Sequence, residues 1–280
     1  MEVIETAAAV GGSLQPKVIP LSIAELPPLI VCWRRLSVSN VSGDLASPRV
    51  GKTQMGTHLR MATPQDAAGI RAIYAPVVRE TPISFEIVPP TEEEMGARVG
   101  KTLTRYPWLV CTAHERLLGY AYAGGHSERA AYQWSVNVSV YVHSRARRIG
   151  VGQVLYDTLF AVLRLQGFIR AYAGITLPNE ASVGFHESFG FTSVGVFRRV
   201  GYKMGAWHDV GYWQMTLQSS NGRPSPPRPL PSLPDDGSLQ EALSAGWMNA
   251  GCDMEAVVKA VDAENLAEAN RETERSESTK

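Results

Sequence analysis

Apolar and polar positions alternate with regular periods only in the middle of the chain, from Thr57 to Gln218. Two stretches, one beginning after Thr63 and one spanning Gly150 to Gln166, carry apolar residues every three or four positions, which predicts amphipathic helices. Thr63 is a good N-cap residue and is followed by proline, a typical helix start. Thr91 with three following glutamates forms a capping box and predicts another helix, ending near Arg105.

Short apolar runs bounded by turn residues predict the strands of this central region. They lie at 59–62, 108–113, 117–123, 132–142, 171–176, 191–199 and 209–217, and a further helix is predicted at 179–189. The resulting order is β α α β β β α β α β β. It predicts the α/β fold class, with a mixed sheet and helices on its faces.

The two ends of the chain differ from the centre. Residues 1–56 show no clear period and are expected to be a poorly ordered extension. Residues 219–251 are expected to be a proline-rich linker, because six prolines fall within 219–234 and favour a polyproline-like spacer, with an SH3-type ligand as the alternative. Residues 252–280 form an acidic tail with a predicted amphipathic helix, which could dock on the core or on a partner, or fray.

Charge and cysteine content exclude several classes of protein. With 27 basic and 27 acidic side chains, the chain offers no net positive field, so no nucleic-acid partner is expected. No apolar stretch is long enough to cross a membrane, and the first residues lack a basic signal-peptide region. The three cysteines are scattered and fit neither a disulfide framework nor a metal site, which favours a cytoplasmic location.

The stretch with the clearest chemistry is SVYVHSRARRIGVG, residues 139–152, where an apolar strand leads through a basic turn and two glycines into a helix. Glycines let a ligand approach the backbone closely. The free N–H groups and the positive dipole end of the helix can then hold a pyrophosphate. The Rossmann and P-loop glycine patterns are absent, and two glycines at a helix start also fit a plain tight turn.

Arg147-x-x-Gly150-x-Gly152 resembles the signature with which GNAT N-acetyltransferases hold the pyrophosphate of acetyl-CoA. The resemblance narrows to the phosphinothricin and methionine sulfone acetyltransferase branch because seven motifs occur in family order. They are RYPWLV at 105–110, AYAG at 121–124, AYxW at 131–134, SVYV at 139–142, LPNxxSV at 177–183, HExxGF at 186–191 and WHDVGYWQ at 207–214. The resemblance covers nearly all of 58–218 and neither tail.

This resemblance implies the GNAT acyl-CoA N-acyltransferase fold, with a splayed central sheet and flanking helices. It implies an enzyme, usually a homodimer, that transfers acetyl directly from acetyl-CoA to the primary amine of a small amino-acid-like acceptor. Asn179 would hydrogen-bond the CoA arm and also fits a helix N-cap. Backbone groups of Val140, Tyr141 and Val142 would hold the arm and polarise the acetyl carbonyl. The pyrophosphate would be held by Arg147, Arg148, Ile149, Gly150, Val151, Gly152 and Gln153.

Three further residues carry roles implied by the resemblance. His186 takes the place of a tyrosine that protonates the CoA thiolate, although a structural histidine on a helix face is the alternative. Phe85 matches an aromatic residue of the acceptor pocket. Arg129 matches a basic residue suited to a carboxylate or phosphinate, and a solvated loop arginine is the alternative. His208 is a weaker candidate, and surface positions are expected for His58, His114, His126 and His143.

Asn137 is the one departure from the family pattern. The family places a glutamate, the candidate base, two residues before the position that Ser139 occupies here. An amide cannot take a proton at neutral pH, and a positioned base contributes about 10²–10⁴-fold in rate. Catalysis is therefore slow, or water or another group replaces the base, or the acceptor amine has a low pKa. Asn137 stays a candidate for positioning an amine or a water, and a CoA-binding regulatory module with weak or lost catalysis is the alternative function.

Overall fold

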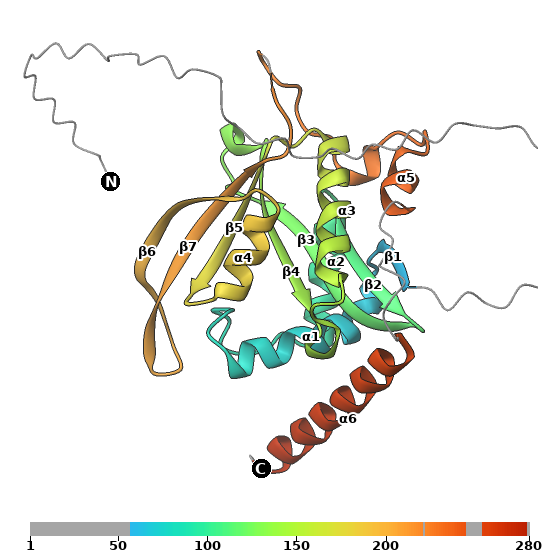
Figure 1. Cartoon of the computed structure of the whole chain (residues 1–280), viewed down its shortest axis with the longest axis vertical. Coiled ribbons are helices and arrows are strands. Elements are labelled where there is room, and N and C mark those ends of the chain that lie inside the picture. The colour runs from blue at the N-terminus through green and yellow to red at the C-terminus, as the bar shows by residue number, and fades with distance from the viewer. Residues whose placement is uncertain (1–56, 221, 245–253, 279–280) are drawn as a thin grey trace, which may run out of the picture. The chain divides into compact units, whose positions relative to one another are not determined.

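One seven-stranded sheet dominates the computed structural model, which describes residues 57–220, 222–244 and 254–278 (Figure 1). The spatial order is β1-β2-β3-β4-β5-β7-β6, and every neighbouring pair is antiparallel except β4 and β5. The strands are β1 (Thr57–Met61), β2 (Trp108–Ala113), β3 (Arg116–Gly125), β4 (Ser135–Val142), β5 (Arg170–Leu177), β6 (Thr192–Lys203) and β7 (Ala206–Thr216). The predicted mixed sheet is confirmed. The expected N-terminal extension lies outside the described residues.

Helices cover both faces of this sheet. They are α1 (Ala67–Glu80), α2 (Glu92–Leu103), α3 (Val151–Gln166), α4 (Glu180–Ser188), α5 (Ser238–Ser244) and α6 (Met254–Ser278), with single 3-10 turns η1 (Pro64–Asp66), η2 (Ala130–Tyr132), η3 (Ser144–Ala146) and η4 (Leu230–Ser232). The start of α2 follows from local chemistry. Glu94 N–H donates to the Thr91 hydroxyl at 3.1 Å, and its carboxylate accepts from Thr91 N–H at 2.8 Å.

The alternation of β4 side chains separates two apolar cores. Val136 and Val138 point to the face covered by α3, where they pack in the same cluster as Leu155 and Leu159. Tyr141 points to the opposite face and packs with the cluster built by α1 and α2. Because successive residues of a strand face opposite ways, Asn137 and Ser139 share the α1/α2 face with Tyr141.

The sheet splits between β4 and β5. These strands pair in parallel only at Ser135, Val136 and Asn137, and the last paired residues are Asn137 and Tyr172. Beyond that point β4 stays paired to β3 and β5 to β7, so the two halves of the sheet diverge, as Figure 1 shows. The splayed sheet expected from the sequence is therefore present, with its apex at Asn137.

Three predicted strand boundaries are wrong, one of them the end of the strand predicted at 191–199, which continues to Lys203. The strand predicted from residue 132 begins at Ser135, because Ala130–Tyr132 fold into a 3-10 turn. The last strand, predicted from 209, begins at Ala206, because Met204 and Gly205 take positive φ angles of 52° and 77° and close a tight hairpin after Lys203.

The segment after the sheet lies against the domain. The Gln166 side-chain amide donates to the carbonyls of Arg105 and Arg228 at 2.8 Å each, and Trp134 Nε1 donates to the Ser225 carbonyl at 2.8 Å. The proline-rich residues therefore follow the surface of the core, and their role as a linker stays a prediction. Within the described ranges, no helix is long and apolar enough to span a bilayer.

Candidate active site

A cleft opens where β4 and β5 separate. Its lining comes from both strands, from α4 and from the loop after α1: Ile83, Val138, Ser139, Val140, Tyr141, Ala173, Gly174, Ile175, Thr176, Asn179, Ser182 and His186. Because the β4–β5 ladder ends at Asn137, the backbone groups of β4 that face β5 beyond it take no part in that ladder. Buried backbone polar groups require partners, so this edge is suited to hydrogen-bonding a ligand.

The start of α3 has the features of an anion site. Gly150 is its N-cap residue with a φ of 96°, and Arg148 also has a positive φ, 64°. No side chain of residues 57–220, 222–244 or 254–278 caps the helix, so its first N–H groups are left for another acceptor. Arg147 and Arg148 are exposed beside it. Free donors, the helix dipole and two guanidinium groups together fit a pyrophosphate.

Gly152 also contributes to the packing between this loop and α4. A Cβ at Gly152 would come within 3.2 Å of the Phe185 ring, so a larger residue here would require that ring to shift by a few tenths of an ångström. Ile149 packs against the α3-side core, whereas Gln153 is exposed and donates to Asp157 at 3.1 Å. The loop is therefore anchored on one side and open on the other.

His186 lies on α4, lines the cleft and is only 5% exposed. Its Nδ1 lies 2.8 Å from the Ser182 carbonyl, which can only accept, so Nδ1 carries the proton. Nε2 then accepts from the Tyr156 hydroxyl at 2.9 Å. Burial lowers the pKa of His186 below its ordinary value, although the bond to Ser182 opposes this shift. The imidazole is thus held neutral with both nitrogens occupied.

Asn179 begins α4 as the expected N-cap. Its side-chain oxygen accepts from Ser182 N–H at 3.2 Å. Among the described residues, its amide nitrogen has no protein partner, and the residue lines the cleft. The capping role and a ligand-binding role are therefore compatible.

Asn137 stands at the apex of the split, and its side chain is exposed. Its oxygen lies 3.0 Å from Nδ1 of His126, and its amide nitrogen donates to the Gly125 carbonyl at 3.4 Å. The His126 ring stacks on Tyr172 with the ring centres 4.3 Å apart. His126 was expected at the surface and instead belongs to this half-buried group. This contact depends on the β3–β4 register, which pairs Gly124 with Asn137 and which the sequence pattern does not give.

The other sequence candidates are more scattered. Phe85 lies in the α1–α2 loop against β6, where a Cβ at Gly201 would overlap its ring. Arg129 is exposed before η2 and, among the described residues, its side chain makes no hydrogen bond or ion pair. His208 donates to the Lys203 carbonyl at 3.0 Å, a structural contact. Their acceptor-binding roles stay predictions. His143, expected at the surface, is only 4% exposed and contacts Asn265 of α6.

A second cavity, of about 180 Å³, lies on the α1/α2 face and was not predicted. Its lining is Tyr74, Glu86, Met95, Arg98, Thr102, Trp108, Tyr120 and Tyr122. Glu86 accepts from Arg98 at 2.7 Å and from the Tyr74 hydroxyl at 3.0 Å. Burial raises the pKa of Glu86, but these two bonds outweigh it and keep the carboxylate charged. Trp108 Nε1 is buried and has no hydrogen-bond partner within the part of the chain that the structure describes.

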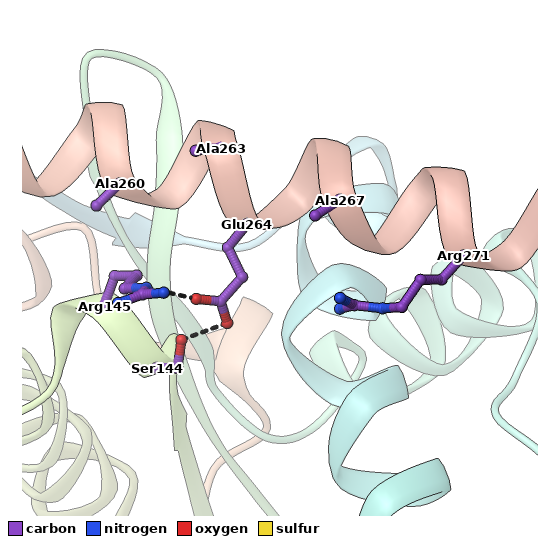
Figure 2. Close-up of a pocket in the computed structure, with 7 residues that line it drawn as sticks. All are labelled: Ser144, Arg145, Ala260, Ala263, Glu264, Ala267 and Arg271. Atoms are coloured by element: carbon purple, nitrogen blue, oxygen red, sulfur yellow. Dashed lines mark hydrogen bonds and ion pairs between the residues drawn. The ribbon is translucent and has the colours of Figure 1, made fainter.

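The acidic helix α6 contacts the segment that leads into the glycine loop. Glu264 accepts from the Ser144 hydroxyl and from Arg145 Nε, the latter at 2.7 Å. Figure 2 shows Glu264 pointing from α6 toward these two residues of η3, with Arg271 on the same side of the helix. Burial raises the pKa of Glu264, but the bonds from Ser144 and Arg145 hold it below its ordinary value. The helix therefore fastens the chain just ahead of Arg147.

The structure thus combines a splayed sheet, a cleft at its apex and an uncapped glycine turn beside that cleft. These are the features expected of an acyltransferase. The sequence profile of the acetyltransferase (GNAT) domain matches residues 59–211. The chain therefore belongs to the GNAT family and is an N-acetyltransferase.

Similar proteins match the same central region. The phosphinothricin N-acetyltransferase of Streptomyces viridochromogenes is 40% identical over 172 residues, which are 61% of this chain and 92% of the relative. The L-methionine sulfoximine/L-methionine sulfone acetyltransferase of Salmonella typhimurium is 31% identical over 160 residues, 57% of this chain and 94% of the relative. The crystal structure of a phosphinothricin acetyltransferase from Sinorhizobium meliloti in complex with AcCoA superposes with a TM-score of 0.58 and 30% identity, covering 61% of this chain and 94% of the other.

Proposed function

We propose that this chain transfers acetyl from acetyl-CoA directly to the primary amine of a small amino-acid-like acceptor, of the phosphinothricin or methionine sulfone type. The observation that carries the proposal is the cleft at the end of the β4–β5 ladder. Strand β4, which lines this cleft, leads through η3 to the uncapped start of α3. The names of the similar proteins support the choice of donor and acceptor.

The residues present fit acetyl-CoA, which when bound supplies an activated thioester carbonyl. The N–H groups at Gly150 to Gln153 and the exposed Arg147 and Arg148 would bind its pyrophosphate. The free edge of β4, at Val140, Tyr141 and Val142, would hydrogen-bond the pantetheine arm and direct one N–H at the acetyl oxygen. The amide nitrogen of Asn179, whose oxygen caps α4, would add a donor.

His186 would act at the thiol side of the cleft. As a neutral imidazole bonded to the Tyr156 hydroxyl, it can relay a proton toward the departing sulfur only together with that hydroxyl. Burial raises the pKa of Tyr156 above its ordinary value, so its hydroxyl stays protonated and remains a hydrogen-bond donor to Nε2.

The acceptor assignment is tested with the full-length protein. Acetyl-CoA is mixed with phosphinothricin or L-methionine sulfone, and thiol release is followed while mass spectrometry identifies the product. N-acetylphosphinothricin, which has no free amine, is the matched control acceptor. We expect thiol release with the free amines and none with the blocked one. A protein that binds acetyl-CoA by calorimetry yet acetylates neither amine would contradict the proposal.

One observation favours a second candidate, a CoA-binding regulatory module with weak or lost catalysis. Asn137 stands at the apex of the cleft and cannot itself accept a proton. The same assay separates the two, because a regulatory module would bind acetyl-CoA tightly and show no acceptor-dependent thiol release.

A homodimer in the cytoplasm completes the proposal, with no nucleic-acid or membrane partner. Large apolar side chains are exposed together on the β6–β7 hairpin: Val194, Phe197, Val200, Tyr202, Met204 and Trp207. Exposed apolar patches commonly mark protein–protein contacts. Light scattering should give twice the mass of one chain, and Phe197→Ser should shift it toward one.

A further inference from the structure

The reaction proposed above needs a proton acceptor that Asn137 cannot be. A primary amine is mostly an ammonium at neutral pH, and an ammonium has no lone pair with which to attack a carbonyl. Imidazole is the side chain best suited to accept a proton near pH 7. His126 is the histidine bonded to Asn137, at 3.0 Å.

Asn137 determines which ring nitrogen of His126 is free. The amide nitrogen of Asn137 is engaged by the Gly125 carbonyl, so its oxygen faces His126 and can only accept. Nδ1 of His126 must therefore carry the hydrogen, and in the neutral ring Nε2 carries the lone pair. Among the described residues, no protein group is hydrogen-bonded to Nε2. The asparagine thus fixes the tautomer that presents a base.

His126 lies next to the end of the cleft where β4 and β5 still pair. It bonds Asn137 and stacks on Tyr172, the two residues that form the last β4–β5 pair. The next residues of those strands, Val138 and Ala173, line the cleft. Asn137 lies on the α1/α2 face, whereas the α3-side core carries Tyr156, the partner of His186. The two histidines therefore serve opposite faces of the splayed sheet.

The side chains packed around His126 are uncharged. The groups that face it are Tyr172 of β5, Tyr132 of η2 with the ring centres 5.7 Å apart, and Asn137 of β4. Among the described residues, no charged side chain is hydrogen-bonded or ion-paired to it, and its charged sequence neighbours Glu128 and Arg129 are exposed.

We propose that His126 is the general base of the reaction and that Asn137 is its positioning residue; this rests on the proposed acetyl transfer. Nε2 takes one proton from the acceptor ammonium, leaving a neutral amine and an imidazolium. The amine nitrogen forms the C–N bond as the C–S bond of the thioester breaks and its electron pair goes to sulfur. The proton lost by the new amide nitrogen neutralises the thiolate, and the imidazolium returns its proton to solvent.

The test compares kcat/KM for phosphinothricin from pH 6 to pH 9 in wild type and His126→Asn. The asparagine amide can replace Nδ1 as a donor to Asn137 but has no group at Nε2. We expect a loss of about 100-fold at pH 7, shrinking as pH rises because the acceptor then loses its proton to solvent. The matched control is His58→Gln on the exposed edge strand β1, which should keep the wild-type profile.

A rescue variant keeps the base role separate from a structural one. Adding Asn137→Glu to His126→Asn should recover most of kcat/KM and move the acidic limb of the profile to lower pH, because a carboxylate titrates below an imidazole. Calorimetry with acetyl-CoA checks that each variant is folded. An active wild type with an unchanged His126→Asn profile, or a loss that the glutamate does not rescue, would overturn the base role alone. A wild type without turnover would overturn the proposed function, and the base role with it.

Discussion

Single residues decide the chemistry of this cleft through backbone angle and burial. Gly150 has a φ of 96°, in the left-handed region that β-branched residues avoid at a cost of roughly 1–2 kcal/mol. His186 is held neutral by burial, and its tautomer is set by the Ser182 carbonyl. The tautomer of His126 is fixed in the same way by the side-chain oxygen of Asn137. In each case a backbone or amide group fixes what a neighbouring side chain can do.

Gly150→Val should weaken acetyl-CoA binding by at least about tenfold while the fold persists, because the side chain would turn the first N–H groups of α3 away from the pyrophosphate. Calorimetry gives the affinity and circular dichroism checks the fold. Gly195→Val is the matched control, since a Cβ at Gly195 in β6 meets open space and no positive φ is required there. Equal affinities for the two variants would refute the pyrophosphate assignment.

The burial of His186 predicts how stability depends on pH. Its folded-state pKa lies below the value of 6.5 for a free histidine, so as pH falls below 6.5 the unfolded chain takes up a proton first. The free energy of unfolding should therefore fall with acidification from pH 7 to 5.5, by at most about 1.4 kcal/mol per pH unit for each such histidine. Urea titrations should show a smaller slope for His186→Gln. His143, whose pKa is also lowered by burial, supplies the remainder. An identical slope in the variant would exclude His186 as the source.

Whole elements are joined to the domain by charge as well as by apolar packing. Helix α6 carries Glu264 against η3, and Glu268 and Glu272 against Arg79 of α1, at 2.8 and 2.5 Å. Burial raises the pKa of Glu272, but bonds from Arg79 and Arg71 hold it below its ordinary value. Glu264 and Glu272 therefore stabilise the docked helix above about pH 4.5 and lose that contribution as pH falls through their lowered pKa values.

Glu264→Gln should loosen α6 and the segment before the glycine loop. The expected loss is small, about 0.5–1 kcal/mol, because Arg145 is largely exposed to solvent. Hydrogen exchange should show faster exchange in α6 and in residues 143–150, and added salt should produce the same change in wild type. Glu255→Gln is the control, because its ion pair is with Lys259 inside α6. Unchanged protection at 143–150 would mean that the helix does not fasten this segment.

The sequence predicted those elements whose signals are local. The capping box at Thr91 set the start of α2, and the glycines at 150 and 167 bound α3. The late start of β4 was missed because Ala130–Tyr132 form a turn inside an apolar run. The His126–Asn137 contact was also missed, since it depends on the register that pairs Gly125 with Val136. The periodicity of apolar residues determines neither the register between strands nor the side-chain hydrogen bonds between elements.

At the scale of the described molecule, a GNAT domain is extended by a C-terminal helix, α6, that packs against it. Helix α6 lies outside the matched region 59–211, yet Val258 and Val261 are buried in the main core cluster. The periodicity of the tail predicted a helix, but its docking partners come from residues almost 200 positions away, such as Arg79 with Glu268. Such long-range charge pairs cannot be read from composition.

Ending the chain at Ser244 should lower the free energy of unfolding by roughly 3 kcal/mol, because the apolar contacts of Val258 and Val261 are lost. The KM for acetyl-CoA should rise while kcat changes little, since α6 contacts the chain ahead of the glycine loop and lines no part of the cleft. Chemical denaturation and steady-state kinetics measure the two effects. A truncated chain that is folded but inactive would place α6 in the reaction itself.

The stoichiometry of acetyl transfer by the full-length chain tests the proposed function most directly. Thiol released from acetyl-CoA and N-acetylated phosphinothricin are quantified in the same samples over time. We predict one N-acetylated amine for each thiol released, and slower formation of both products with Gly150→Val at acetyl-CoA concentrations below the wild-type KM. Thiol release without N-acetylated product, or no acceptor-dependent release at all, would contradict the claim that this cleft joins acetyl-CoA to a small primary amine.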